Sequence, residues 1–210
     1  MFARLTCAFT VAAATSLASA DLVNPLIPSW AGDATASTYE WNSFTEAYQA
    51  PNFADTPFSP DVMLFNFTPG AIIAGSGNIY NPGGGLNIHM YGSSSFERAV
   101  LNIATSGTEL NYEDTYLFVS SANEAETASI YATAIERSRV EVPGLGYNVT
   151  VAYEFDTSDV SFEIADWGFF YNGSNPHLSL DAVRLDLNTI PAPGALLALG
   201  FAPMMRRRRK

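Results

Sequence analysis

The sequence predicts an all-β protein, an antiparallel β-sandwich, because short alternating apolar runs dominate it and Gly, Pro, Asn and Asp separate these runs. The clearest run is Tyr147 to Phe155, where every second residue is apolar, as in a half-buried strand. A long amphipathic helix pattern is missing between the two ends of the chain. Residues 21–189 have the length of one domain with a substantial core.

Further strands are expected along the chain, and turn residues suggest how some of them pair. The Pro69-Gly70 turn predicts that the strands before and after it form a pair. Asp156 to Asp159 is a second turn, and the alternation resumes after it, so a hairpin is expected there. The further strands are Asp61 to Phe67, Ala71 to Ala74, Leu86 to Met90, Glu97 to Ala104, Thr115 to Ser120 and a run through Val160, Phe162 and Ile164.

Two segments are ambiguous. Glu124 to Arg139 fits a helix or a strand, and the surrounding β pattern favours the strand. In Leu178 to Leu187 the apolar residues change parity, which predicts a β-bulge near Asp181. The alternative for this second segment is a central strand that is buried on both faces.

The N-terminal 20 residues have the three parts of a secretory signal peptide. Arg4 supplies the positive charge and Leu5 to Leu17 the apolar stretch, which is too short for an uncleaved spanning helix. Ala18 and Ala20 form the small-residue cleavage site, so the exported chain is expected to begin near Asp21.

The exported domain is strongly acidic. Six of the ten basic residues lie in the two ends of the chain, so residues 21–189 keep four arginines against all 21 carboxylates, which gives a formal charge of −17. Such a charge disfavours binding to nucleic acid or anionic lipid. Cys7 lies in the signal peptide, so no disulfide is expected in the domain.

Residues 190–210 form a tail of three parts. The first is stiff and non-helical because of its prolines. The second, Ala195 to Met205, is an uncharged and mostly apolar run, and a block of positive charge follows it. The first and third parts are Pro191, Ala192, Pro193 and Gly194, and Arg206, Arg207, Arg208, Arg209 and Lys210.

This order of parts resembles the PEP-CTERM sorting signal of bacterial envelope proteins, with Ala192 in place of the usual glutamate. The resemblance implies recognition and cleavage near Pro191 to Gly194 by an exosortase-like membrane protease. It also implies export, a transient hydrophobic membrane helix, and association with exopolysaccharide in the matrix. An ordinary membrane anchor is the alternative, but the run from Gly194 to Met205 is shorter than the roughly 20 residues of a spanning helix.

The last expected strand, His177 to Asp186, resembles the closing strand of jelly-roll proteins of the galactose-binding and carbohydrate-binding kind. Thr38 to Phe44 is similar to a segment of exported proteins that carry this tail. The resemblance implies a jelly-roll sandwich. It also implies a structural calcium ion, with Glu40 and Asp181 as the candidate ligands; solvated carboxylates are the alternative interpretation.

Catalytic motifs are not evident in the sequence. His89 and His177 lie in no metal-binding pattern, and His89 is expected to be a solvated or hydrogen-bonded strand residue. No serine lies in a G-x-S-x-G turn. The pairs Glu113-Asp114 and Glu163 with Asp166 would suit a glycoside hydrolase only at the right separation.

Trp167 to Tyr171, followed by a polar turn-forming stretch, suggests a loop in which Trp167 and Tyr171 stack on sugar rings; the alternative is a core cluster. The sequence therefore favours a non-enzymatic exported envelope or matrix protein without a cofactor. A carbohydrate-binding module is the alternative function, and a secreted glycoside hydrolase is less favoured.

Overall fold

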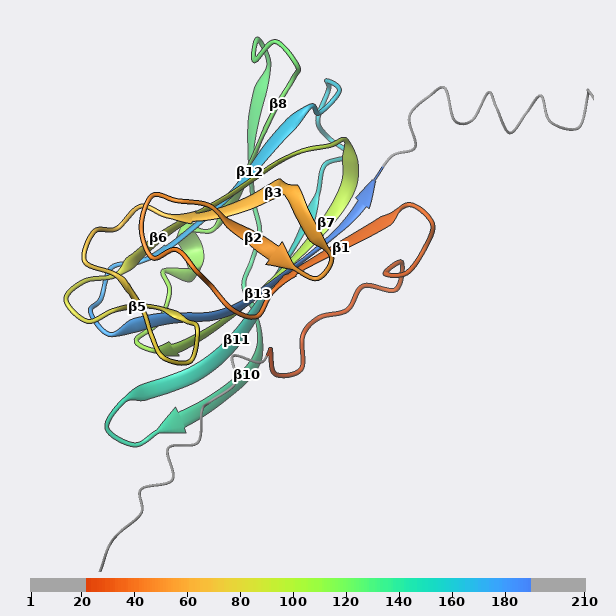
Figure 1. Cartoon of the computed structure of the whole chain (residues 1–210). Coiled ribbons are helices and arrows are strands. Elements are labelled where there is room, and N and C mark those ends of the chain that lie inside the picture. The colour runs from red at the N-terminus through yellow and green to blue at the C-terminus, as the bar shows by residue number, and fades with distance from the viewer. Residues whose placement is uncertain (1–21, 190–210) are drawn as a thin grey trace, which may run out of the picture.

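The computed structural model describes residues 22–189, which form a sandwich of two antiparallel sheets (Figure 1). The predicted signal peptide, with Ala18 and Ala20, lies outside the described residues. So does the predicted sorting signal, with Pro191 to Gly194 and Arg206 to Arg209. The part of the chain that is described contains no helix long and apolar enough to cross a membrane.

The first sheet has seven strands, with β13 at its centre. Along one side of β13 lie β5 and, further along, β1; on the other side lies β7. The strands are, in spatial order, β10 (Ile135–Val142), β11 (Gly146–Asp156), β7 (Phe96–Gly107), β13 (Leu178–Thr189), β5 (Ile79–Asn81) and β4 (Ile72–Ile73), with β1 (Ala36–Trp41) paired to β13.

The second sheet has six strands, and β6 and β12 are its central pair. A short 3-10 turn, η1 (Tyr112–Asp114), precedes β8. The strands are, in spatial order, β2 (Asn52–Asp55), β3 (Phe58–Asn66), β6 (Leu86–Ser93), β12 (Asp166–Gly173), β8 (Tyr116–Ser120) and β9 (Thr127–Tyr131).

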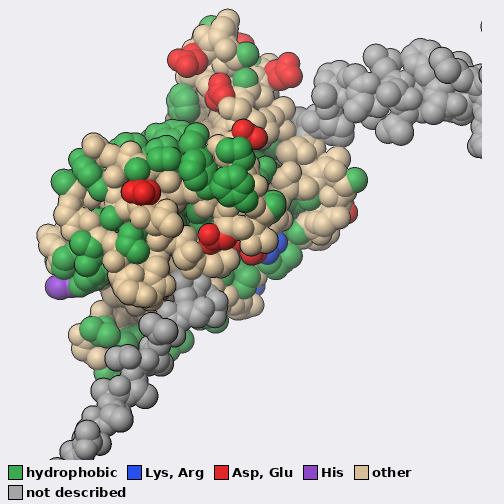
Figure 2. All heavy atoms as spheres, in the orientation of Figure 1, with side chains coloured by type: hydrophobic (Ala, Val, Ile, Leu, Met, Phe, Trp, Pro, Cys, Tyr) green, Lys and Arg blue, Asp and Glu red, His purple; other side chains and the backbone are tan. Residues whose placement is uncertain are grey.

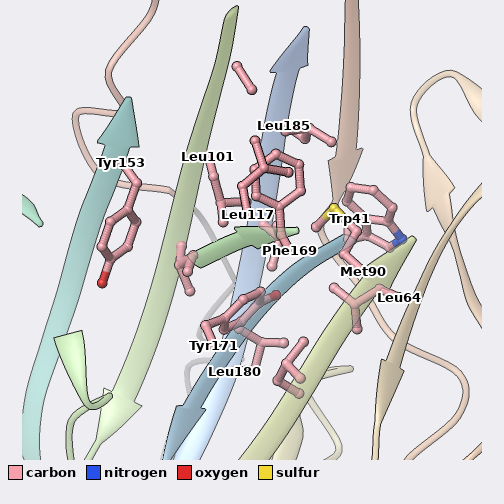
Figure 3. Packing of buried hydrophobic residues seen from close by; sticks show 14 of the residues in the cluster. Trp41, Leu64, Met90, Leu101, Leu117, Tyr153, Phe169, Tyr171, Leu180 and Leu185 are labelled. Atoms are coloured by element: carbon pink, nitrogen blue, oxygen red, sulfur yellow. The ribbon is translucent and has the colours of Figure 1, made fainter. Parts of the chain in front are cut away.

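The core fills the space between the two sheets (Figure 3). It follows from the period of two in each strand: in β6, Leu86, Ile88 and Met90 are buried, and the residues between them point to the other face. Trp41, Tyr153 and the other large side chains are buried in the same cluster. Each such side chain stabilises the fold by roughly 1.5–3 kcal/mol.

The strand predicted at Tyr147 to Phe155 is confirmed as β11, and the bulge predicted near Asp181 is confirmed as well. The register between β13 and β7 shifts between Leu180 and Ala182, so Asp181 is the additional residue. The strand is also largely buried on both faces, as the alternative interpretation proposed. Glu124 to Arg139 is strand rather than helix, although it divides into β9 and β10 in different sheets.

The predicted hairpin after Asp156 is wrong. Residues 157–165 form no strand and carry the chain from β11 to the opposite sheet, where β12 pairs with β6 and β8. The alternating apolar residues have another cause, because Ile164 is buried and Val160 and Phe162 pack on the core. Thr157 fixes the start of this connection by donating from Oγ1 to the carbonyls of β7 residues Phe96, at 2.8 Å, and Glu97, at 3.0 Å.

The predicted pairing across Pro69-Gly70 is also wrong. β3 pairs with β2 and β6, whereas β4 pairs with β5 in the seven-stranded sheet. The turn therefore connects the two sheets. Asn66 at the end of β3 supports this exit, since its Nδ2 donates to the carbonyl oxygens of Ala47, at 2.8 Å, and Thr68, at 3.2 Å.

Candidate functional site

Trp167 and Tyr171, the residues predicted to stack on sugars from a loop, lie on β12 and belong to the core. Figure 3 shows Tyr171 among the core side chains. They are 2% and 1% exposed. The loop interpretation is wrong because the alternation of β12 places Trp167, Phe169 and Tyr171 on the inner face of the sheet. Burial raises the pKa of Tyr171, so its hydroxyl stays neutral. Neither ring can reach a sugar in this structure.

The outer face of the same sheet carries a different set of aromatic side chains. Phe170 points outward from β12, where its direct partners are His89 on β6 and Tyr116 on β8. His89 is in turn paired with Phe65 on β3, and Tyr116 with Tyr131 on β9. These five side chains, Phe65, His89, Phe170, Tyr116 and Tyr131, occupy one register line across five strands, and we call them the aromatic row.

Four of the five rings of the row, from His89 to Tyr131, contact their neighbours directly. The centroids of His89 and Phe170 are 4.7 Å apart, and those of Phe170 and Tyr116 are 4.9 Å apart and nearly parallel. Tyr116 and Tyr131 follow at 5.5 Å. These distances lie within the range of attractive ring pairs, so the side chains stabilise one another in place.

Two further aromatic residues flank the row. Phe67, just after β3, bridges it, with its ring 5.8 Å from Phe65 and 4.7 Å from His89. Tyr91 lies one register line away, 5.8 Å from Phe170. The sheet therefore presents a continuous aromatic surface rather than isolated rings.

The row also has polar groups with defined roles. The Nε2 of His89 lies 3.0 Å from Asn87 Oδ1, and its Nδ1 lies 2.8 Å from the Tyr91 hydroxyl. Since an amide oxygen only accepts, Nε2 donates and Nδ1 of the neutral ring accepts from Tyr91. Burial lowers the pKa of His89, which favours this neutral form. The prediction of a hydrogen-bonded strand histidine is confirmed.

Gly168 makes room for these rings. It lies opposite Tyr91 on β6 and Phe118 on β8, on the outward side of β12. A Cβ at this position would lie 2.9 Å from Phe170 Cε2 and 3.1 Å from Tyr91 Cδ1. Because glycine has no side chain, the rings of Phe170 and Tyr91 can lie over the backbone of Gly168 and occupy the space that a side chain would take.

The surface of the row is apolar and open. No member carries a formal charge when His89 is neutral. Tyr131 is 68% exposed, and the remaining four are partly exposed. Figure 2 shows hydrophobic side chains gathered in a band over β3, with acidic side chains around it. An open apolar band with phenol and imidazole edges can stack on a flat ligand and exchange hydrogen bonds with it.

Glu40 and Asp181, the predicted calcium ligands, have separate partners. Glu40 Oε1 accepts from Arg184 at 2.6 Å, and Arg184 also holds the fully buried Asp186. Asp181 Oδ1 accepts from Asn78 and Ser179. Within residues 22–189, no group of three or more acidic or histidine side chains gathers as a metal site would require.

The remaining candidates are dispersed over the fold. His177 lies in the turn before β13, with Nδ1 2.7 Å from the Tyr80 hydroxyl. The carboxylates of Glu113 and Asp114 are exposed on η1. Glu163 is exposed in the connection before β12, and Asp166 accepts from Ser93 Oγ at 2.7 Å. None of these groups belongs to the row.

The aromatic row was not predicted from the sequence, although part of its signal is present there. In the predicted strand Leu86 to Met90 the even-numbered residues are the buried ones. The odd-numbered residues His89 and, just after it, Tyr91 therefore point outward. Phe170 likewise has the parity opposite to Trp167. An aromatic residue at several outward positions is unusual for solvated faces. The register that unites these positions depends on pairings between distant strands, which the pattern of each strand does not contain.

Comparison with protein-family models and with curated proteins finds no match for this chain.

Proposed function

We propose that this protein is an exported, non-enzymatic module of the cell envelope or extracellular matrix that binds a polysaccharide chain through the aromatic row. The observation that carries the proposal is the register: five ring-bearing side chains from five strands form one line on an open sheet face. A line of rings suits a linear ligand that repeats along its length.

The chemistry of the surface favours sugar over other linear ligands. Sugar rings offer apolar C–H faces for stacking and hydroxyls for Tyr91, Tyr116 and Tyr131. The row contains no lysine or arginine, and the domain has a formal charge of −17 from four arginines and 21 carboxylates. Nucleic acid and anionic polymers are therefore poor ligands for it, because their binding depends on positive charge.

The two ends of the chain support the cellular part of the proposal. The signal peptide would export the protein, and the PEP-CTERM-like tail would hold it in the membrane until an exosortase-like protease cuts it near Pro191 to Gly194. We also infer a jelly-roll-like connectivity. It is supported by the repeated crossing between sheets at β7 to β8, β9 to β10, β11 to β12 and β12 to β13.

The binding part is tested by affinity electrophoresis of the full chain in native gels that contain a neutral polysaccharide. The wild-type protein should be retarded, and Phe170→Ala should weaken binding by about tenfold, corresponding to about 1.4 kcal/mol. Tyr147→Ala is the matched control, because it removes a partly exposed aromatic ring from the opposite sheet. Equal retardation of Phe170→Ala and wild type across a panel of neutral polysaccharides would overturn the proposal.

The sorting part is tested by the intact mass of the protein isolated from its own cells. A C-terminus near Pro191 to Gly194 is expected. A chain that still ends at Lys210 and remains in the membrane would contradict processing.

A further inference from the structure

A groove lies on the outer face of the other, seven-stranded sheet. One hollow of about 510 Å³ is lined by β7, β10, β11 and β13, and an adjoining hollow of about 430 Å³ extends toward Tyr80 and His177. The two share Ser76, Asn78, Ser106 and Ser179 as lining residues. They are therefore one continuous feature, which we call the β13 groove.

The bulge in β13 places a carboxylate in this groove. Leu180 and Ala182 are opposite Thr105 and Ala104 of β7, so the additional residue Asp181 has no partner in the ladder. Its side chain lines the groove. Without the bulge, the apolar side chains of one half of β13 would lie on the outer face of the sheet instead of in the core. The same additional residue that keeps both halves facing the core therefore places the Asp181 carboxylate in the groove.

The carboxylate has neutral neighbours only. Asp181 Oδ1 accepts from Asn78 Nδ2 at 2.6 Å and from Ser179 Oγ at 2.7 Å, while Oδ2 receives no hydrogen bond from the described residues. No lysine or arginine lines either part of the groove. A largely buried charge without a counter-charge is costly, and a cation from outside would relieve that cost.

The adjoining amide adds to the excess of acceptors. Asn78 is 7% exposed, and its Oδ1 has no hydrogen-bond partner in the described structure. Its orientation is fixed because Nδ2 donates to Asp181. Asn78 Oδ1 is itself shielded from solvent, so Asp181 Oδ2 is the oxygen of the pair that a ligand in the groove can reach, and among the described residues it still lacks a donor.

We propose that the β13 groove binds a protonated primary amine carried on a hydroxylated ligand, of which an amino sugar is the simplest, and that Asp181 Oδ2 accepts from the ammonium group. An ammonium group offers three donors and one positive charge in a small volume. The hydroxyls of the ligand would meet the Ser76 and Ser106 side chains. The Tyr80 ring, at the other end of the groove, offers an apolar face.

The geometry favours an amine over a metal ion or a neutral sugar. Calcium takes six to eight oxygen ligands and usually several carboxylates, whereas the lining supplies one carboxylate. A neutral sugar would leave the Asp181 charge without a counter-charge. This inference does not depend on the aromatic row, which lies on the opposite sheet, so either proposal can fail alone.

Titration of the full chain with glucosamine, followed by amide chemical shifts in NMR spectra, tests the inference. Glucosamine should shift the amides of Asn78, Ser179 and Asp181, and glucose and N-acetylglucosamine should bind at least tenfold more weakly. Asp181→Asn should weaken glucosamine binding at least tenfold. Asp61→Asn is the control, because it removes the same charge from an exposed position on β3 in the opposite sheet. It should bind glucosamine as the wild type does.

Three results would overturn the inference: shifts elsewhere than the groove, equal binding of glucose and glucosamine, or full binding by a folded Asp181→Asn protein. If calcium binds in a way that depends on Asp181 and prevents glucosamine from binding, the groove is a metal site and the amine proposal is wrong. If Asp181→Asn does not fold, the wild-type shift map and the comparison of the three sugars still decide the matter.

Discussion

Two glycines in neighbouring strands should lose very different amounts of stability on the same substitution to alanine. Gly92 on β6 is buried next to Trp167, and Gly168 on β12 lies under the rings of Phe170 and Tyr91 on the outer face. Neither has a positive φ, so alanine is allowed by the backbone at both positions. The comparison therefore isolates what each Cβ would meet.

In Gly92→Ala the new Cβ would lie 2.3 Å from Trp167 Cζ2, whereas carbon atoms pack best at about 3.5–4.0 Å. The indole cannot move easily, because Trp167 is in the core and its Nε1 donates to Ser94 Oγ at 3.0 Å. We expect the free energy of unfolding to fall by about 1–3 kcal/mol. For a domain of this size, the melting temperature falls by about 2–4 °C for each kcal/mol.

In Gly168→Ala the nearest atoms belong to the rings of two partly exposed side chains, at 2.9 Å for Phe170 Cε2 and 3.1 Å for Tyr91 Cδ1. These rings can move by a few tenths of an ångström. Alanine is also favoured over glycine within a strand by roughly 0.5–1 kcal/mol, so the net change in unfolding free energy should be within about 1 kcal/mol. Displacing Phe170 should nevertheless weaken polysaccharide binding by about threefold, or about 0.7 kcal/mol.

Thermal unfolding and affinity electrophoresis of the two variants, with the wild type beside them, measure both quantities. The reasoning is refuted if Gly92→Ala is as stable as the wild type, or if Gly168→Ala loses as much stability as Gly92→Ala. A Gly168→Ala protein that folds normally and binds polysaccharide with wild-type affinity would show that the position of the Phe170 ring is irrelevant to binding.

Three further predictions concern buried polar groups. Arg184→Met should lower the unfolding free energy by about 3–5 kcal/mol in urea denaturation, because it leaves the fully buried Asp186 without its two hydrogen bonds of 2.8 Å from the guanidinium; an unchanged midpoint would contradict this. Asn52→Ala should cost about 1–3 kcal/mol in the same assay, because the Asn52 Oδ1 accepts from two backbone amides at 2.8 and 2.9 Å; a loss as small as that of an exposed asparagine would contradict it. Burial raises the pKa of Asp181 from 3.8 to about 6, so the folded state holds this proton more tightly, and the wild type should lose stability relative to Asp181→Asn as the pH rises from about 4 to 6; a constant difference over that window would contradict the assignment.

The pH prediction concerns Asp181 alone because its surroundings supply no other titrating group in that half of the groove. The ionisable groups of the adjoining half are His177 and Tyr80, which are hydrogen-bonded to each other. Both remain present in the Asp181→Asn variant. Their contributions therefore cancel in the difference between the two proteins.

Local patterns in the sequence were sufficient to predict most of the strands. The alternation in Tyr147 to Phe155 predicts a strand and the change of parity after Leu180 predicts a bulge, and both were confirmed. The half-buried character of the first strand was not, because Val149 to Tyr153 are buried on both faces. Pairing was predicted less well. The connection after Asp156 and the turn at Pro69-Gly70 each carry the chain between sheets, and a crossing leaves the same local signature as a hairpin.

The candidate site could not be predicted for the same reason. The aromatic row consists of single residues from five strands, and only the register of the whole sheet brings them into line. The aromatic neighbours of Trp167 in the chain suggest a binding loop, yet the strand alternation buries Trp167 and leaves Phe170 partly exposed. Proximity in the sequence and proximity on a sheet face are different properties.

The most direct test of the central proposal is to record the aromatic ring signals of the protein by NMR while a neutral polysaccharide or its oligosaccharides are added. The account predicts that the rings of Phe65, His89, Phe170, Tyr116 and Tyr131 shift together with one affinity, while the buried Trp167 and the opposite-sheet Tyr147 remain unchanged. Shifts confined to the opposite sheet, or binding that leaves the five rings unaffected, would contradict it.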